Sequence, residues 1–130
     1  MTINGFDHVQ VAIPANGEAS ARGFYGDLLG LTELVKSPAL AVRGGCWFTA
    51  GSAVLHLGVE DPFVPARKAH PAFRVDDLSE LLERLGAAGC DRVIPDPSEI
   101  PGVHRFHAFD PFGNRVEFVQ LGPEVGSCCS

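Results

Sequence analysis

Apolar and polar residues alternate along several short stretches of the chain, and a period of two is typical of half-buried strands. The stretch GFDHVQVAIP shows this first, because Val9, Val11 and Ile13 share one face while His8 lies on the other. The same reasoning predicts a set of short strands along the whole sequence. Their expected ranges are 6–13, 32–36, 45–50, 53–59, 70–75, 91–94, 103–109 and 114–121.

Two other stretches have the spacing of an amphipathic helix. In the first, the apolar face consists of Ala21, Phe24, Tyr25, Leu28 and Leu29. Gly30 suits the left-handed position that ends a helix. The second helix is expected to begin after Asp77, because Glu80 follows three residues later in the spacing of a capping box.

The order of these elements repeats, since strand, helix and three strands are followed by the same series again. Module 1 covers about 5–59, a proline-containing linker covers 60–69, and module 2 covers about 70–121. We therefore expect an α+β fold of two βαβββ modules in one domain. Each helix would cover the outer face of a mixed sheet, which leaves the other faces free to line a shared cleft.

The repeat brings four polar residues into equivalent positions. His8 and His70 are separated by 62 residues, and His56 and Glu117 by 61. Each lies on the strand face opposite to the larger apolar side chains, so all four are expected to project into the cleft. Imidazoles with one carboxylate suit divalent first-row metals, and two histidines with a carboxylate also suit non-haem iron.

A single histidine or glutamate in a strand is more often structural or solvated than a ligand, so the hypothesis rests on all four together. His104 and His107 do not share the spacing of the repeat and are expected to line the cleft or the surface. For Trp47 and Phe48, a place in the core or the cleft wall competes with a substrate contact.

Composition limits the class of protein. The chain has 130 residues, 45% of them hydrophobic and 20% charged, which suits one globular domain. A net charge of −6 without a basic stripe argues against a nucleic-acid or membrane partner. No apolar run has membrane-spanning length, and the first residues lack the pattern of a secretory signal, so we expect a cytoplasmic location.

The cysteines form no metal-binding or disulfide pattern. Cys46, Cys90, Cys128 and Cys129 include no C-x-x-C pair. We expect reduced thiols, two of them in a frayed C-terminal tail.

Five segments together carry a family resemblance. FDHVQVAIP, FYGDLLGL, LHLGVE, HPAFRVDDL and DPFGNRVEF resemble the glyoxalase/bleomycin-resistance/extradiol-dioxygenase group, the vicinal oxygen chelate superfamily, from residue 5 to about 121. The resemblance implies paired βαβββ modules that form a metal cup, usually in a homodimer. It leaves open whether the cup is built within one chain or across the dimer.

By position, His8, His70 and Glu117 match the metal-binding points of this superfamily, and His56 matches a fourth. Typical glyoxalase I has a glutamate at that fourth point, and methylmalonyl-CoA epimerases have a glutamine. Glu117 is therefore the one acidic base among the four, and a two-base proton shuttle would need His56 as the second catalytic group.

Three functions follow from the resemblance. The first is a divalent-metal-dependent lyase or isomerase, using Ni, Fe, Mn, Co or Zn, for a small substrate that chelates the metal through adjacent oxygens. The second is an extradiol-type Fe(II) dioxygenase, and the third is a non-catalytic drug- or metabolite-binding protein. Candidate substrate contacts are Trp47, Phe48, Arg105 and His107.

Overall fold

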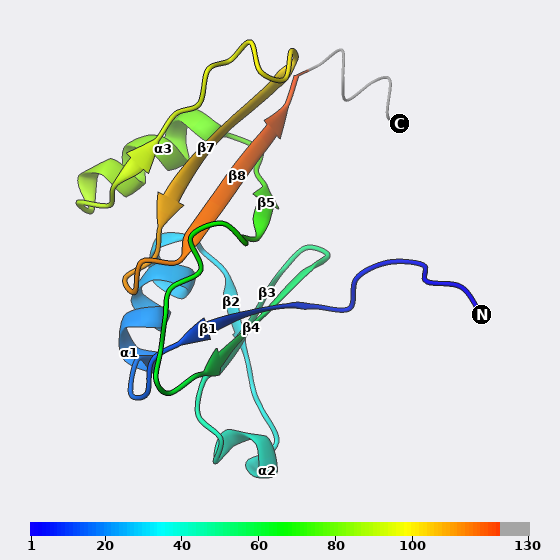
Figure 1. The fold of residues 1–130 in the computed structure, drawn as a ribbon, viewed down its shortest axis with the longest axis vertical. Coiled ribbons are helices and arrows are strands. Elements are labelled where there is room, and N and C mark those ends of the chain that lie inside the picture. The colour runs from blue at the N-terminus through cyan, green and yellow to red at the C-terminus, as the bar shows by residue number, and fades with distance from the viewer. Residues whose placement is uncertain (123–130) are drawn as a thin grey trace. The chain divides into compact units, whose positions relative to one another are not determined.

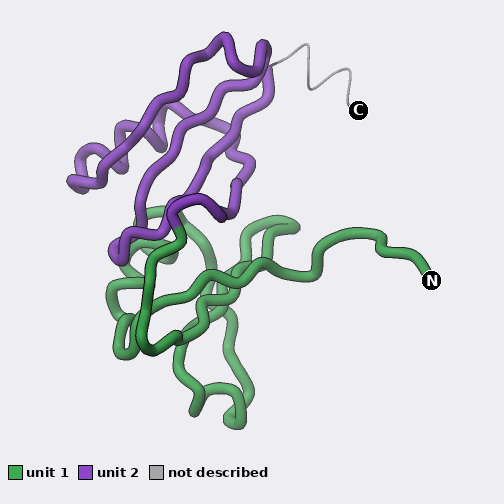
Figure 2. Tube along the Cα trace, viewed as in Figure 1, with its two compact units in different colours: residues 1–66 green, residues 67–130 purple. Residues whose placement is uncertain are grey.

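The structure is a computed structural model and describes residues 1–122. The chain divides between Ala66 and Arg67 into two compact units, which are coloured separately in Figure 2. Cys128 and Cys129, expected in a frayed tail, lie outside the described residues. Cys46 and Cys90 are both free thiols.

Each unit has a strand, a helical segment and three further strands in that order, and the first unit has an additional short helix; Figure 1 labels most of these elements. The first unit contains β1 (Val9–Ile13), α1 (Glu18–Ala21), η1 (Arg22–Leu28), β2 (Thr32–Leu34), α2 (Pro38–Ala41), β3 (Cys46–Ala50) and β4 (Ala53–Val59). The second contains β5 (Ala72–Arg74), α3 (Leu78–Ala87), β6 (Arg92–Val93), β7 (Val103–Phe109) and β8 (Arg115–Leu121).

The two sheets have the same strand order. The first is β1-β4-β3-β2 and the second is β5-β8-β7-β6. The pairs β1–β4 and β5–β8 are parallel, and the other pairs are antiparallel. The predicted α+β fold with two mixed four-stranded sheets is confirmed.

The first helix differs in detail from the single α-helix that the apolar spacing predicts. After α1 the chain widens into the π-helical segment η1, where the amide of Leu29 donates to the carbonyl of Phe24, five residues earlier, at 2.9 Å. Phe24 and Tyr25 are nevertheless buried, and the Tyr25 ring lies 6.3 Å from that of Phe48 on β3. Over so few turns, apolar spacing does not distinguish the two helix types.

The second helix begins as predicted. The carboxylate of Asp77 accepts a hydrogen bond from the amide of Glu80 at 3.1 Å, which confirms Asp77 as the N-cap. Leu81 and Leu85 are buried, and α3 contacts β6 and β8 beside the second sheet, as Figure 1 shows. The helix therefore covers one face of this sheet and leaves the other face for polar groups.

The strands β1 and β5 begin more than one residue later than expected. Because β1 starts at Val9 and β5 at Ala72, His8 and His70 lie just before the parallel strands rather than on them. The short helix α2, with Ser37 as its N-cap, was not predicted, since four residues are too few to show a helical period.

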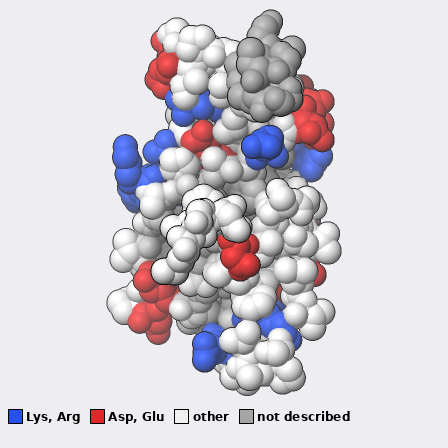
Figure 3. All heavy atoms as spheres, turned by 90° about the vertical axis from the view of Figure 1, so that its right-hand side faces the viewer, with Lys and Arg blue, Asp and Glu red and all other residues white. Residues whose placement is uncertain are grey.

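On the face drawn in Figure 3, Lys and Arg side chains lie in small groups among Asp and Glu. Among the described residues, no helix combines the length and apolar character needed to cross a bilayer.

The turn between β7 and β8 is closed by a buried carboxylate. One Asp110 oxygen accepts hydrogen bonds from the amides of Phe112 and Asn114, each at 2.9 Å, and the other accepts one from the Asn114 side chain. Asp110 is 5% exposed and Asn114 is 1% exposed. The turn therefore sets how β7 and β8 are aligned.

We expect Asp110→Ala to lower the free energy of unfolding by about 2–3 kcal/mol, because buried donors lose their acceptor. Urea unfolding measures this. Asp96→Ala is the matched control, since Asp96 makes a similar turn with Ser98 at an exposed position and should cost less. If both variants lose the same free energy of unfolding, the buried turn contributes no more to stability than the exposed one.

Candidate functional site

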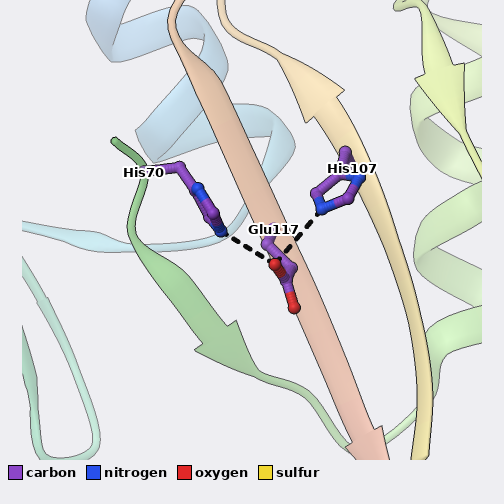
Figure 4. Close-up of side chains that lie close together, drawn as sticks. All are labelled: His70, His107 and Glu117. Atoms are coloured by element: carbon purple, nitrogen blue, oxygen red, sulfur yellow. Dashed lines mark hydrogen bonds and ion pairs between the residues drawn. The ribbon is translucent and has the colours of Figure 1, made fainter. Parts of the chain in front are cut away.

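A histidine and a glutamate meet on the open face of the second sheet. Glu117 lies on β8 between the buried Val116 and Phe118, so alternation turns its carboxylate away from α3. His70 approaches from the segment before β5, and its Nε2 lies 2.8 Å from Glu117 Oε1. Figure 4 shows the two side chains pointing toward each other.

The other nitrogen of His70 fixes which atom carries the proton. Nδ1 lies 2.7 Å from the backbone carbonyl of Lys68, which can only accept a hydrogen bond. Nδ1 must therefore carry a hydrogen, and in the neutral ring Nε2 presents a lone pair to Glu117. Two lone pairs at 2.8 Å require a cation between them, either a proton or a metal ion.

His107 lies on the other side of the same carboxylate. It pairs directly with Glu117 across β7 and β8, is 7% exposed, and places Nε2 3.2 Å from Glu117 Oε1. Arg115 Nη2 donates to the same Nε2 at 2.8 Å. Because a guanidinium only donates, this contact requires a lone pair on Nε2.

The surroundings hold His107 neutral and Glu117 ionised. Burial, followed by the charge of Arg115, lowers the pKa of His107, against the opposing effect of Glu117. Burial alone would raise the pKa of Glu117, but the contacts with His70 and His107 outweigh it and the pKa is lowered. A proton between His70 Nε2 and Glu117 Oε1 accounts for this direction, because Nε2 of a neutral His107 accepts from Arg115 instead.

A second arginine extends the group. Arg105 lies on the same face of β7 as His107, with Nη1 3.8 Å from Glu117 Oε2. Its Nη2 donates to Glu99 at 2.7 Å, and the Glu99 side chain is 55% exposed. Because this ion pair is exposed to solvent, an anionic group of a ligand could replace the Glu99 carboxylate as the partner of Arg105.

In the first unit, His8 is oriented in the same way as His70. Its Nδ1 lies 2.9 Å from a carboxylate oxygen of Asp7, so the neutral ring directs the lone pair of Nε2 outward. The side chain is 40% exposed.

His56 is held between two other rings. Its centroid lies 3.9 Å from that of His8 and 4.0 Å from that of Trp47, with interplanar angles of 17° and 6°. Lys36 Nζ lies 5.7 Å from the centre of the Trp47 ring. This stack of Lys36, Trp47, His56 and His8 occupies the face of the first sheet opposite to the buried Leu55 and Leu57.

The stack limits how His8 and His56 can bind an ion. An imidazole binds a metal in the plane of its ring, and nearly parallel rings in contact cannot both point a nitrogen at one ion. One of the two rings has to turn before both can coordinate the same metal.

The structure thus brings together some of the predicted residues and separates others. His70 meets Glu117, and His8 meets His56, each pair within its own unit. Phe48 is 1% exposed and packs against Tyr25, so it has a core role rather than the expected substrate contact.

Sequence reasoning missed two features of this site. His107 was expected to contact substrate, but it faces Glu117 and forms with it and His70 a group of possible metal ligands. Alternation along β7, with Phe106 and Ala108 buried, is the signal that could have placed it. Arg115 was not considered, and nothing in its spacing marks it.

Comparison with known proteins identifies the family. Residues 5–118 match the model of the Glyoxalase/Bleomycin resistance protein/Dioxygenase superfamily, and the chain belongs to this superfamily. No curated protein matches the chain at a significant level.

Solved structures agree with this assignment. A protein assigned to the glyoxalase family from Bacillus anthracis is 45% identical, with a TM-score of 0.87 over 93% of this chain and 98% of that one. The fosfomycin resistance protein FosX of Listeria monocytogenes (15% identity, TM-score 0.76, 99% and 100% covered) shares the fold. So does the antibiotic-binding protein TnmS3 of a Streptomyces species (22% identity, TM-score 0.71, 94% and 99% covered).

The stack predicts a pH dependence of stability. Burial, then the charges of His8 and Lys36, lower the pKa of His56, against the effect of Asp7. Below about pH 6.5 the unfolded chain takes up a proton at this position that the folded chain resists, so acidification costs stability.

We expect His56→Phe, which keeps a flat ring in the stack, to reduce the loss of unfolding free energy between pH 7.5 and pH 5. Urea unfolding of both proteins in the presence of a chelator measures this. His107 also has a lowered pKa, so part of the dependence should remain. If the pH dependence is the same in both proteins, the assignment to His56 is wrong.

Proposed function

We propose that the protein is a divalent-metal-dependent enzyme of the glyoxalase type, a lyase or isomerase acting on a small molecule with two adjacent oxygens. The observation that supports it most is the contact of His70 Nε2 with Glu117 Oε1 at 2.8 Å. With Nδ1 committed to the carbonyl of Lys68, this contact needs a cation, and superfamily membership favours a metal.

The donor set fits a first-row divalent ion. Imidazole nitrogen with one carboxylate suits Zn, Fe, Ni, Co or Mn, whereas a site for Mg or Ca would consist of oxygen ligands. The hydrogen bond from His70 Nδ1 to Lys68 is the support that metal-binding histidines usually have on their second nitrogen.

His8 and His56 are the proposed ligands from the first module. His8 has the same support on Nδ1, here from Asp7, and its Nε2 is free to bind. The stacked His56 would have to turn in order to join it. We also propose that the protein is a homodimer, in keeping with its superfamily.

The reaction would be a proton transfer next to a carbonyl. When bound, the ion polarises the substrate oxygens and stabilises the negative charge that develops as the proton leaves. Glu117, whose pKa is lowered, and His56, whose pKa is also lowered, are both in the basic form near pH 7 and able to accept that proton. Arg105 would bind an anionic group of the substrate, and Trp47 would contribute a flat apolar wall.

Metal binding is the first test. We expect the purified, untagged protein to retain about one Zn(II), Ni(II), Fe(II), Co(II) or Mn(II) per site after dialysis, as measured by plasma mass spectrometry. His70→Ala and Glu117→Gln should each lower the affinity for the retained metal by at least about 100-fold, because each removes a ligand.

His104→Ala is the matched control, since His104 is an exposed histidine on the neighbouring strand β7. It should leave the metal affinity unchanged. A wild-type protein that holds no metal and gains none on reconstitution would refute the proposal and favour a passive binding protein.

The class of reaction needs a separate measurement. We expect the metal-loaded protein to exchange the proton next to the carbonyl of some α-hydroxycarbonyl compounds with D₂O, followed by NMR, and Glu117→Gln or His56→Phe to slow this exchange. Oxygen consumption with a catechol and Fe(II), without any proton exchange, would instead indicate a dioxygenase.

A further inference from the structure

Equivalent positions of the two units carry different side chains beside the central polar residue. In the first sheet Trp47 pairs directly with His56, and in the second His107 pairs directly with Glu117. Trp47 covers the face of its neighbour as a flat ring. His107 instead points a nitrogen at its neighbour, as Figure 4 shows.

Three electron-rich atoms therefore converge in the second unit. In the neutral ring of His70, Nε2 carries a lone pair because Nδ1 donates to Lys68, and Nε2 of His107 carries one because Arg115 donates to it. Both face Glu117 Oε1, at 2.8 and 3.2 Å. With neutral imidazoles neither contact with the carboxylate contains a hydrogen, so a proton or a metal ion has to lie between these atoms.

We propose that His107 is itself a metal ligand, so that His70, His107 and Glu117 form a three-residue cation site within the second unit. This inference rests on the proposed metal dependence and adds a ligand that the repeat pattern does not contain. All three ligands belong to the second unit, so His8 and His56 would not be needed for the ion to bind there.

The distances fit a common ion. Neighbouring ligand atoms at about 2.1 Å from a first-row metal are separated from each other by about 3.0 Å in octahedral and about 3.4 Å in tetrahedral coordination. The contacts to Glu117 Oε1, at 2.8 and 3.2 Å, come within a few tenths of an ångström of the octahedral value and need a small outward shift for the tetrahedral one. All three ligand atoms lie within 4.8 Å of one another.

Arg115 occupies the position that the ion would take on His107. Its Nη2 uses the same lone pair at 2.8 Å, and one lone pair cannot serve both a guanidinium and a metal. Among the described residues, Arg115 Nε is buried without a hydrogen-bond partner. Arg115 thus competes with the ion, and its displacement on metal binding would release a cationic group beside the site.

The wild-type protein provides the most direct test. The full chain, labelled with ¹⁵N in its five histidines, is titrated with Zn(II) and followed by NMR of the ring nitrogens. We expect the Nε2 signals of His70 and His107 to move to metal-bound positions, while those of His104 stay in place. This measurement does not depend on any variant being folded.

Variants then measure the contribution of His107. We expect His107→Gln to weaken Zn(II) binding by at least about 10- to 100-fold, while His104→Gln has no effect. The double variant His8→Ala with His56→Ala should still bind Zn(II). Circular dichroism shows whether each variant keeps its fold.

A double-mutant cycle tests the competition. Arg115→Met should tighten Zn(II) binding about 3- to 10-fold, because it frees the lone pair and removes a positive charge. The gain should largely disappear when His107 is already glutamine. Arg105→Met is the matched control, since Arg105 contacts Glu117 but not His107, and its effect should persist in that background.

The outcomes separate this inference from the proposed function. If Zn(II) binds with the His107 signal unmoved and His107→Gln binds equally well, His107 is not a ligand and the metal enzyme proposal stands. If the wild-type protein binds no metal, both fail. If the Arg115→Met gain is the same with and without His107, the competition is refuted.

Discussion

The alternation of side chains along β8 is the constraint on which the site depends. Val116 and Phe118 are buried against the layer that holds α3, and Glu117 lies between them on the opposite face. A shift of pairing by one residue would bury the carboxylate and expose both apolar side chains. The hydrophobic free energy of the core therefore fixes the position of Glu117, and the ladder with β7 places His107 directly opposite.

The two units show how one architecture holds different chemistry. Strand order and register are the same in both, yet the first unit presents stacked rings and the second presents two imidazoles around a carboxylate. The backbone supplies equivalent positions, and the side chains at these positions decide between stacking and ion binding. A residue can therefore have a functional role even when the equivalent position in the other repeat carries a chemically different side chain.

This distinction explains what the sequence could and could not predict. The period of two and the helical spacing located the strands, the Asp77 cap and the face occupied by Glu117, because burial follows these patterns directly. Comparison of the two repeats identified His70 as a candidate ligand. It did not identify His107, because the equivalent residue in the first unit is Trp47, which cannot bind a metal. The stacking of His56 depends on ring orientation, and the contact of Arg115 depends on side-chain rotamers, neither of which leaves a periodic signal.

The short edge strand β5 is the part of the fold that brings His70 to the site. His107 and Glu117 are ten residues apart on one hairpin, whereas His70 and Glu117 are 47 residues apart and meet only when the three-residue β5 docks at the edge of the sheet. Closing the longer loop costs more chain entropy, so the His70 contact is the more expensive of the two to form. An ion that ties His70 to Glu117 would hold this short edge strand against local opening, and the chemistry of the site would then also protect the sheet margin from fraying.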